Sequence, residues 1–169
     1  MLDPREADTV EELAEIGVTF AELELRAERC SILHGDEQHP RPVIQCFSGF
    51  DVNQLDLLDW ISFTWEDRLV SQGEVLSLTP AEFRGRFALL VGLHSSRARF
   101  LGFLHADHER PFSPQSVEQF QAFSRLYSEH LELLMGPESE RATEIRPAQP
   151  PTYQAQDESL QSYTWMDCV

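Results

Sequence analysis

Two apolar runs near the middle of the chain, separated by a short polar segment, form the clearest pattern in the sequence. Residues 87–94 (FALLVGLH) and 99–106 (RFLGFLHA) are apolar at positions that point to both sides of a strand, which is typical of strands buried on both faces. The polar residues 95–98 (SSRA) leave room only for a tight antiparallel connection. The sequence therefore predicts a hairpin inside a sheet that has a layer on each face.

A long amphipathic helix is predicted after the hairpin. Ser113 followed by Pro114 matches a helix N-cap with proline at the first helical position, and Gly136-Pro137 gives a helix stop. Between them, apolar residues recur at spacings of three and four and polar residues take the remaining positions. The apolar positions are Val117, Phe120, Phe123, Leu126, Tyr127, Leu131 and Leu134.

Weaker patterns upstream predict the other elements of the domain. They are a helix at about 9–25, a strand at 29–34, a turn rich in Gly and Pro, a strand at 43–47, helical turns between 52 and 72, a short strand at 75–78 and a turn or helix start at 79–82.

The segment 100–107 (FLGFLHAD), followed by 110–114 (RPFSP) and the long helix, resembles the end of a GAF domain. In that family the closing strand commonly has two hydrophobic residues, Gly, a hydrophobic residue and Leu, and the next loop ends in Phe-Ser before the last helix. The resemblance implies an α+β fold, in which an antiparallel sheet carries the N- and C-terminal helices on one face and a short helical segment on the other.

The predicted organisation has three parts: an N-terminal extension (1–8), a GAF-like domain (9–135) and an acidic tail (136–169) containing Pro, Ser and Gln. Aromatic and apolar residues return at the end of the tail, including Tyr163, Trp165 and Met166. Aromatic residues in an acidic, disorder-prone segment are typical of a docking peptide. The alternative is that the same residues fold back and cover the domain.

Composition and charge narrow the function classes. The 169 residues, 41% of them hydrophobic, suffice for the core of one soluble domain. The 29 acidic residues oppose 13 basic residues, all arginine, and give a net charge of −16. This charge disfavours binding to nucleic acid or an anionic membrane and favours a protein partner with a basic surface. Neither a membrane segment nor an export signal is evident at the sequence level, so we expect a cytoplasmic protein.

Motifs that carry catalysis or bind cofactors are missing from the sequence. The chain has no lysine, which excludes Schiff-base and P-loop chemistry and the lysine-containing motif of nucleotide-binding GAF domains. No cysteine lies between Cys46 and Cys168, where bilin-binding GAF domains attach their chromophore. The motifs GxSxG, HExxH and GxGxxG do not occur. We therefore expect neither an enzyme nor a cofactor.

A few residues remain candidates for a site. Phe63, Trp65, His94, Phe103 and His105 are predicted to line a small aromatic pocket. The alternative is that they fill the core, because protein interiors pack without large voids. The segment 105–108 (HADH) offers metal-ligating side chains, but a third ligand is not evident, and no metal is predicted.

The sequence favours a non-enzymatic, GAF-like regulatory or adaptor protein that acts by binding another protein. The resemblance also implies a homodimer through the terminal helices. A small-molecule sensor with a compact aromatic pocket is the alternative. A third hypothesis, an oxidoreductase that uses Cys30 and Cys46, competes with the view that both are small apolar strand residues.

Overall fold

A computed structural model describes residues 2–36, 39–51, 56–71 and 73–136 of the chain. In order, its elements are the short 3-10 helix η1 (Pro4–Glu6), α1 (Val10–Leu23), β1 (Arg29–Asp36), β2 (His39–Ser48), α2 (Asp56–Ser71), β3 (Leu76–Leu78), β4 (Phe87–His94), β5 (Phe100–His108) and α3 (Pro114–Met135).

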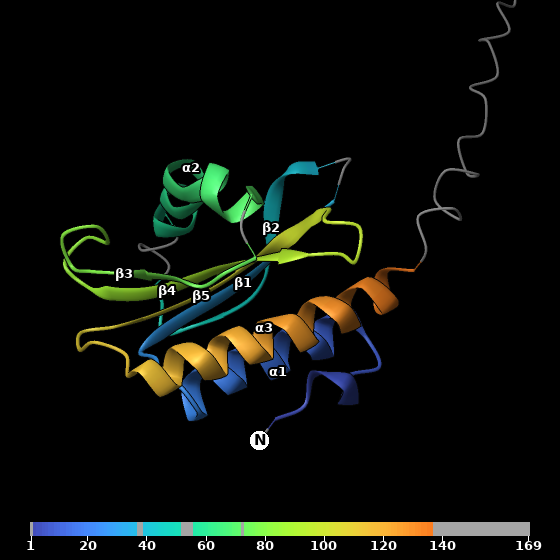
Figure 1. Cartoon of the computed structure of the whole chain (residues 1–169), viewed down its shortest axis with the longest axis horizontal. Helices are drawn as coiled ribbons and strands as arrows, with labels where there is room; N and C mark the ends of the chain where they lie inside the picture. Colours follow the sequence, from blue (N-terminus) through green and yellow to red (C-terminus); the bar gives the residue numbers. More distant parts are fainter. Residues whose placement is uncertain (1, 37–38, 52–55, 72, 137–169) are drawn as a thin grey trace, which may run out of the picture. The chain divides into compact units, whose positions relative to one another are not determined.

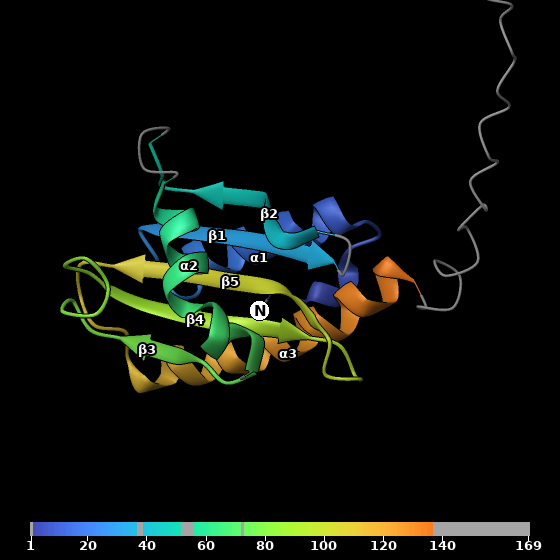
Figure 2. The same cartoon turned by 90° about the horizontal axis from the view of Figure 1, so that it is seen from above.

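The strands form one antiparallel sheet in the order β2-β1-β5-β4-β3. Helices α1 and α3 lie together on one face of this sheet, and α2 lies on the opposite face (Figures 1 and 2). This arrangement confirms the predicted α+β fold with the N- and C-terminal helices on one face and the middle helix on the other.

The predicted hairpin is confirmed as β4 and β5, the latter at the centre of the sheet. Six consecutive residues of β4 and seven of β5 are buried, as expected for strands covered on both faces. The N–H of Ser95 donates to the carbonyl of Arg99 (2.8 Å), and Ala98 takes a left-handed conformation (φ 60°). β5 continues two residues beyond the predicted end, to His108.

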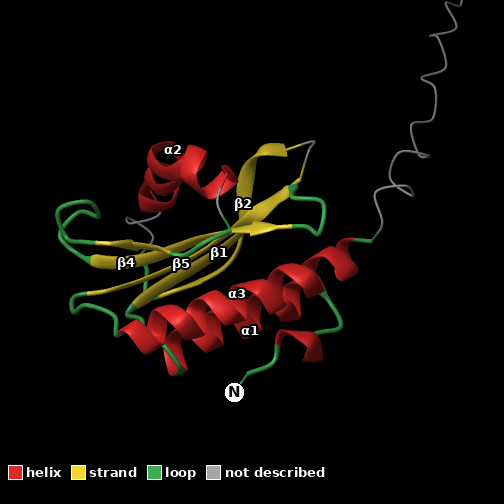
Figure 3. Ribbon diagram, in the orientation of Figure 1, coloured by secondary structure: helices red, strands yellow, loops and turns green. Residues whose placement is uncertain are grey.

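Local capping signals set the ends of the two helices on the lower face (Figure 3). The Oγ of Ser113 accepts from the N–H of Ser116 (3.0 Å), and α3 ends at Met135, with the predicted Gly136 as its C-cap. Thr9 caps α1 by accepting from the N–H of Glu12 (3.2 Å). Each cap satisfies a backbone donor that the helix itself leaves unpaired.

The sheet separates two apolar layers. The layer against α1 and α3 includes Phe20, Ile32, Leu104, Phe123 and Tyr127, together with the buried Cys30. The layer against α2 includes Leu58, Ile61, Phe83, Leu90 and Phe103. Cys30 is therefore a core residue, as expected, whereas Cys46 on β2 is half-buried.

The C-terminal end of α2 is held tightly against β4. A Cβ added at Gly92 would lie 1.9 Å from the backbone oxygen of Leu69, so the glycine permits this close approach. Beside it, Nε2 of His94 lies 2.7 Å from the carbonyl oxygen of Val70. These two contacts fix the helix over the sheet.

Within the described part of the chain, no helix is both long and apolar enough to cross a membrane.

We predict that Gly92→Ala destabilises the domain by about 1–3 kcal/mol, the usual cost of overpacking a well-packed site. The methyl group would collide with backbone that has no rotamer to change. Urea unfolding of the purified protein measures the effect. Gly73→Ala is the matched control, since its Cβ would lie 3.7 Å from His94 Nδ1, an ordinary contact. Equal stability of the two variants would contradict the proposed contact between α2 and β4.

Candidate functional site

Polar side chains gather on the sheet face beneath α2. Ser31 on β1 stands directly opposite His105 on β5, and Asp107 follows on the same face because strand residues alternate. The three residues are 0%, 1% and 0% exposed. Polar groups buried this deeply require hydrogen-bonding partners, and these three residues supply one another.

Ser31, His105 and Asp107 form a continuous hydrogen-bonded chain. The Oγ of Ser31 lies 3.1 Å from His105 Nδ1, and His105 Nε2 lies 3.0 Å from Asp107 Oδ2. Burial lowers the pKa of His105, which keeps the imidazole neutral. We therefore assign the ring proton to Nε2, which donates to the carboxylate, so that Nδ1 accepts from the Ser31 hydroxyl.

Two arginines balance the buried carboxylate of Asp107. Arg29 places Nε 2.9 Å from both oxygens and NH2 2.7 Å from Oδ2, and Arg86 Nε donates to Oδ1 at 2.6 Å. Burial alone would raise the pKa of Asp107. The hydrogen bond from His105, together with the hydrogen bonds and charge of Arg29, outweighs burial and lowers this pKa to about 2. The carboxylate is therefore ionised and paired.

The network continues outward to the protein surface. Arg86 also pairs with Glu28, and this hydrogen bond is the main reason that the pKa of Glu28 is lowered. Arg86 NH1 lies 3.5 Å from Glu109, and His108 Nε2 lies 3.6 Å from Glu28. Arg86 thus connects the surface carboxylates of Glu28 and Glu109 to the buried carboxylate of Asp107.

Aromatic rings cover the imidazole of His105. The centroid of Phe83 lies 5.4 Å from that of His105 in a stacked arrangement, and the centroid of Phe50 lies 5.8 Å away, tilted. Trp60 of α2 packs edge-on against Phe83 at 5.4 Å, and the Arg29 guanidinium lies over Phe50 at 5.5 Å. Side chains of the protein itself therefore fill the space over His105.

The order Ser31, His105, Asp107 contains the nucleophile, base and carboxylate of a hydrolase triad, but its setting differs. Ser31 is fully buried, so a substrate has no access to its Oγ in this structure. The arrangement acts as an internal hydrogen-bonded support that links β1 to β5.

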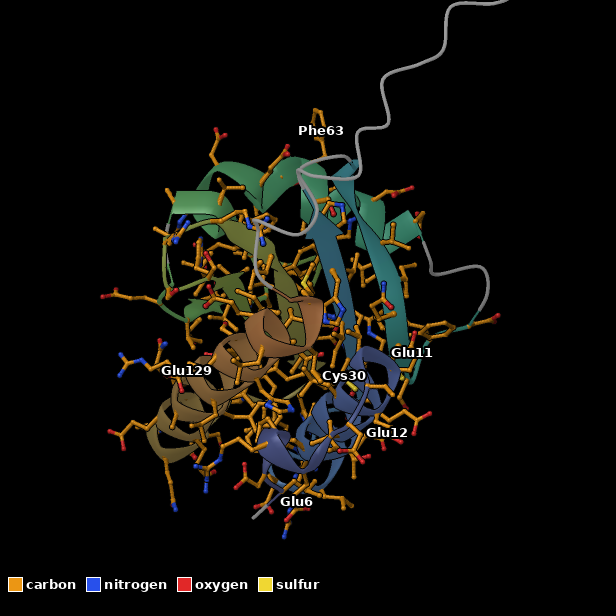
Figure 4. All side chains as sticks on the ribbon, turned by 90° about the vertical axis from the view of Figure 1, so that its right-hand side faces the viewer. Glu6, Glu11, Glu12, Cys30, Phe63 and Glu129 are labelled. Atoms are coloured by element: carbon orange, nitrogen blue, oxygen red, sulfur yellow. The ribbon has the colours of Figure 1, made fainter. Side chains whose placement is uncertain are left out.

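The structure brings together only part of the predicted ligand-binding set. Phe103 and His105 lie on the face toward α2 and are almost fully buried. Trp65 of α2 is half-buried, with the Arg68 guanidinium 5.4 Å from its ring. Phe63 is 88% exposed and projects away from the sheet (Figure 4), so it lines no pocket with the others.

His94 lies apart from His105, near the other end of the hairpin strands. Its ring borders a surface pocket of ≈ 290 Å³. The pocket is also lined by Gly73, Gly92, Ser95, Ser96, Ser124, Arg125, Ser128, Glu129 and Glu132. The lining combines hydroxyls with both signs of charge, unlike the aromatic pocket predicted from the sequence.

Ser31, Arg29, Arg86 and the surface residues Glu28 and Glu109 belong to the network but were missed by the sequence analysis. His105 and Asp107 are two positions apart on a strand predicted to be buried, and this spacing was a usable signal for a polar pair on one face. No local pattern connects the two arginines to it. The predicted docking residues Tyr163, Trp165 and Met166 lie outside the described residues.

We predict that Asp107→Asn destabilises the domain by about 3–5 kcal/mol, because it leaves two guanidinium groups without their buried counter-charge. Urea unfolding at neutral pH measures this loss. Asp56→Asn is the control, because the Asp56 side chain is 73% exposed and its pair with Arg84 is long, at 3.8 Å. Equal stability of the two variants would show that the network contributes little.

Asp107→Asn should also change how the stability of the domain depends on pH. Folding lowers the pKa of Asp107 from 3.8 to about 2, so the unfolded chain binds more protons between these pH values. The stability supplied by the carboxylate is therefore present above pH 3.8 and is lost as the pH falls toward 2. Asp107→Asn should lack this part of the acid dependence in unfolding measured from pH 5 to pH 2. An unchanged acid profile would contradict the lowered pKa.

Comparisons with known proteins identify the fold. No family model matches the sequence, and no curated protein matches it. Solved structures do match. The GAF domain of the cyanobacteriochrome TePixJ superposes with a TM-score of 0.59 at 16% identity, over 78% of this chain and 94% of that one.

Two further structures support the same assignment. The GAF domain of a phosphoenolpyruvate-protein phosphotransferase from Acinetobacter gives a TM-score of 0.60 at 15% identity, over 74% of this chain and 83% of that one. JSC1_58120g3, in its far-red absorbing dark state with bound biliverdin IXa, gives a TM-score of 0.55 at 10% identity, over 79% of this chain and 95% of that one. The chain therefore has the GAF fold.

Proposed function

We propose that this protein is a non-enzymatic regulatory or adaptor module that acts by binding another protein in the cytoplasm. The observation that carries the proposal is the filled sheet face beneath α2. Phe83, Phe103 and His105 are at most 1% exposed there, and Asp107 is held by charged partners from its own chain. A pre-formed apolar pocket, the usual small-molecule site, is not what this packing favours.

In this proposal, the partner protein binds to the outer surface of the domain. The exposed side of α2 presents Phe63, which is 88% exposed, together with the exposed acidic residues Asp59, Glu66 and Asp67. A large exposed aromatic residue among carboxylates suits a partner that offers apolar and basic groups. The net charge of −16 attracts such a partner over longer distances at low salt.

Pairing of two copies through the terminal helices is part of the proposal. Between α1 and α3 there is an apolar hollow of ≈ 330 Å³, lined in part by Leu2, Phe20, Phe123 and Leu126. Apolar side chains of a second copy would bury this surface. The acidic tail supplies a second docking element, with Tyr163, Trp165 and Met166 as its anchors, because large apolar side chains gain most from burial.

A small-molecule sensor is the second candidate, and the pocket beside His94 favours it. Its volume of ≈ 290 Å³ is near the lower end for ligand sites. The hydroxyl and charged lining would suit a small polar ligand. The aromatic pocket predicted from the sequence gives no such support, because its members are separated or packed in the core.

Affinity capture from the native cell extract tests the proposed function. We predict that the full-length protein retains a protein partner and that a chain ending at Met135 loses it, because the anchors in the tail are removed. Trp165→Ala with Met166→Ala should reproduce the loss, whereas Ser159→Ala with Gln161→Ala, in the same tail, should retain the partner. Mass spectrometry of the protein and small-molecule fractions identifies what is bound.

Two results would contradict parts of this proposal. Retention of the partner by the truncated chain would remove the tail and place binding on the domain. A small molecule retained in stoichiometric amount, with no protein partner, would favour the sensor.

A further inference from the structure

The outer edge of β2 carries no paired strand in the described part of the chain. β2 lies at the end of the sheet order and pairs with β1 on one side. Among the residues that the structure describes, no strand pairs with its other side. An edge of this kind exposes backbone N–H and C=O groups that a further strand can pair with.

The second half of β2, residues 43–48, lacks the charged residues and prolines that often protect an edge strand. Residues 43–48 (VIQCFS) contain no charged side chain, although charges normally block an edge against added strands. Pro40 and Pro42 lack backbone donors, so they restrict the available edge to these last six residues. Six residues match the usual length of a strand.

A β-bulge turns two apolar side chains of β2 to the same face. Ile44 pairs with Leu33 and Phe47 with Ser31, with a register shift between Ile32 and Leu33. Residues three apart in a regular strand point to opposite faces, but the extra residue brings both to the α2 side. Ile44 is 37% exposed and Phe47 43% exposed.

The opposite face of the same edge is acidic. Glu11, Glu15 and Glu22 are exposed on α1, and their spacings of four and seven place them on one side of the helix. Glu22 accepts a hydrogen bond from Ser48 of β2, and Glu15 and Glu22 both contribute to raising the pKa of Cys46, after burial. Glu11 and Glu12 point outward from α1 in Figure 4. The acidic row therefore borders the β2 edge.

We propose that the β2 edge binds an extended segment of a partner protein in which basic and apolar residues alternate. Added as a strand, such a segment would place its apolar side chains beside Ile44 and Phe47 and its Lys or Arg side chains beside Glu15 and Glu22. Successive side chains of a strand point to opposite faces, so an alternating segment would present its apolar residues to one face of the sheet and its basic residues to the other. This inference rests on the proposed protein-binding function and adds the surface and the chemistry of the partner.

Charge favours this occupant over a second copy of the chain. Two β2 edges in antiparallel pairing would bring two acidic rows to the same side of the joined sheet, where like charges repel. A basic and apolar segment neutralises the row and pairs the backbone.

Fluorescence anisotropy with labelled peptides tests the proposal on the full-length protein. The probe is a peptide in which Arg and Val alternate. The first comparison peptide has the same composition with its Arg and Val residues in separate blocks, and the second has Glu in place of Arg. We expect the alternating peptide to bind at least about tenfold more tightly than the blocked peptide, because only the alternating peptide satisfies both faces at once.

Two variants locate the binding on the protein. Glu15→Gln with Glu22→Gln should weaken binding roughly fivefold at low salt, as for the loss of two exposed ion pairs. Glu6→Gln with Glu74→Gln, at exposed positions outside β2 and α1, changes the net charge equally and should not. Phe47→Ser should also weaken binding of the alternating peptide, because it removes an apolar side chain that the peptide would contact. Circular dichroism and the Tm show whether each variant is folded.

The outcomes separate this inference from the proposed function. Equal binding of the alternating and blocked peptides, or equal weakening by the two pairs of glutamate substitutions, would overturn the β2 proposal while leaving partner capture intact. A dimer in analytical ultracentrifugation that Phe47→Ser abolishes would make a second copy the occupant and would also overturn it. If the full-length protein captures no protein partner, the proposed function would instead be contradicted.

Discussion

The buried carboxylate of Asp107 is the group around which the α2 side of the sheet is organised. Removing a carboxylate from water costs several kcal/mol unless charged partners surround it. Its partners come from β1 (Arg29), from the residue before β4 (Arg86) and from β5 (His105). These groups meet only when β1, β4 and β5 pair in the observed register, so the network favours this register over alternatives.

The same network fills the sheet face beneath α2. The aromatic rings over His105 and the arginines around Asp107 occupy the sheet face that holds Phe103 and His105, two residues of the predicted aromatic pocket. Surfaces that remain open on the described part of the chain include the outer side of α2, the β2 edge, the hollow between α1 and α3 and the pocket beside His94. The interior is thus filled by the protein's own side chains, and the proposed binding surfaces lie at the periphery, where Phe47 and Phe63 are exposed.

The use of arginine explains how the acidic surface persists. Arg29 and Arg86 are engaged with Asp107, and Arg68 and Arg84 lie over the rings of Trp65 and Trp60. Arginine suits both tasks because its planar group forms bidentate pairs and stacks on aromatic rings. These arginines lie away from the acidic row on α1, which therefore keeps its negative charge.

The sequence by itself determined the elements whose signals are local: the β4–β5 hairpin, the Ser113 cap, the Gly136 stop and hence the α+β class. Periodicity and capping depend on residues a few positions apart, and so they are visible in one dimension. Only the tertiary structure decided that Arg29 reaches Asp107 across 78 positions of sequence, and that a bulge turns Ile44 and Phe47 to one face of an edge strand. It also decided that Phe63 points to solvent, because α2 has aromatic residues on several sides and the helical period alone does not select among them. Strand order and long-range ion pairs depend on which segments meet in space, and no local pattern encodes that choice.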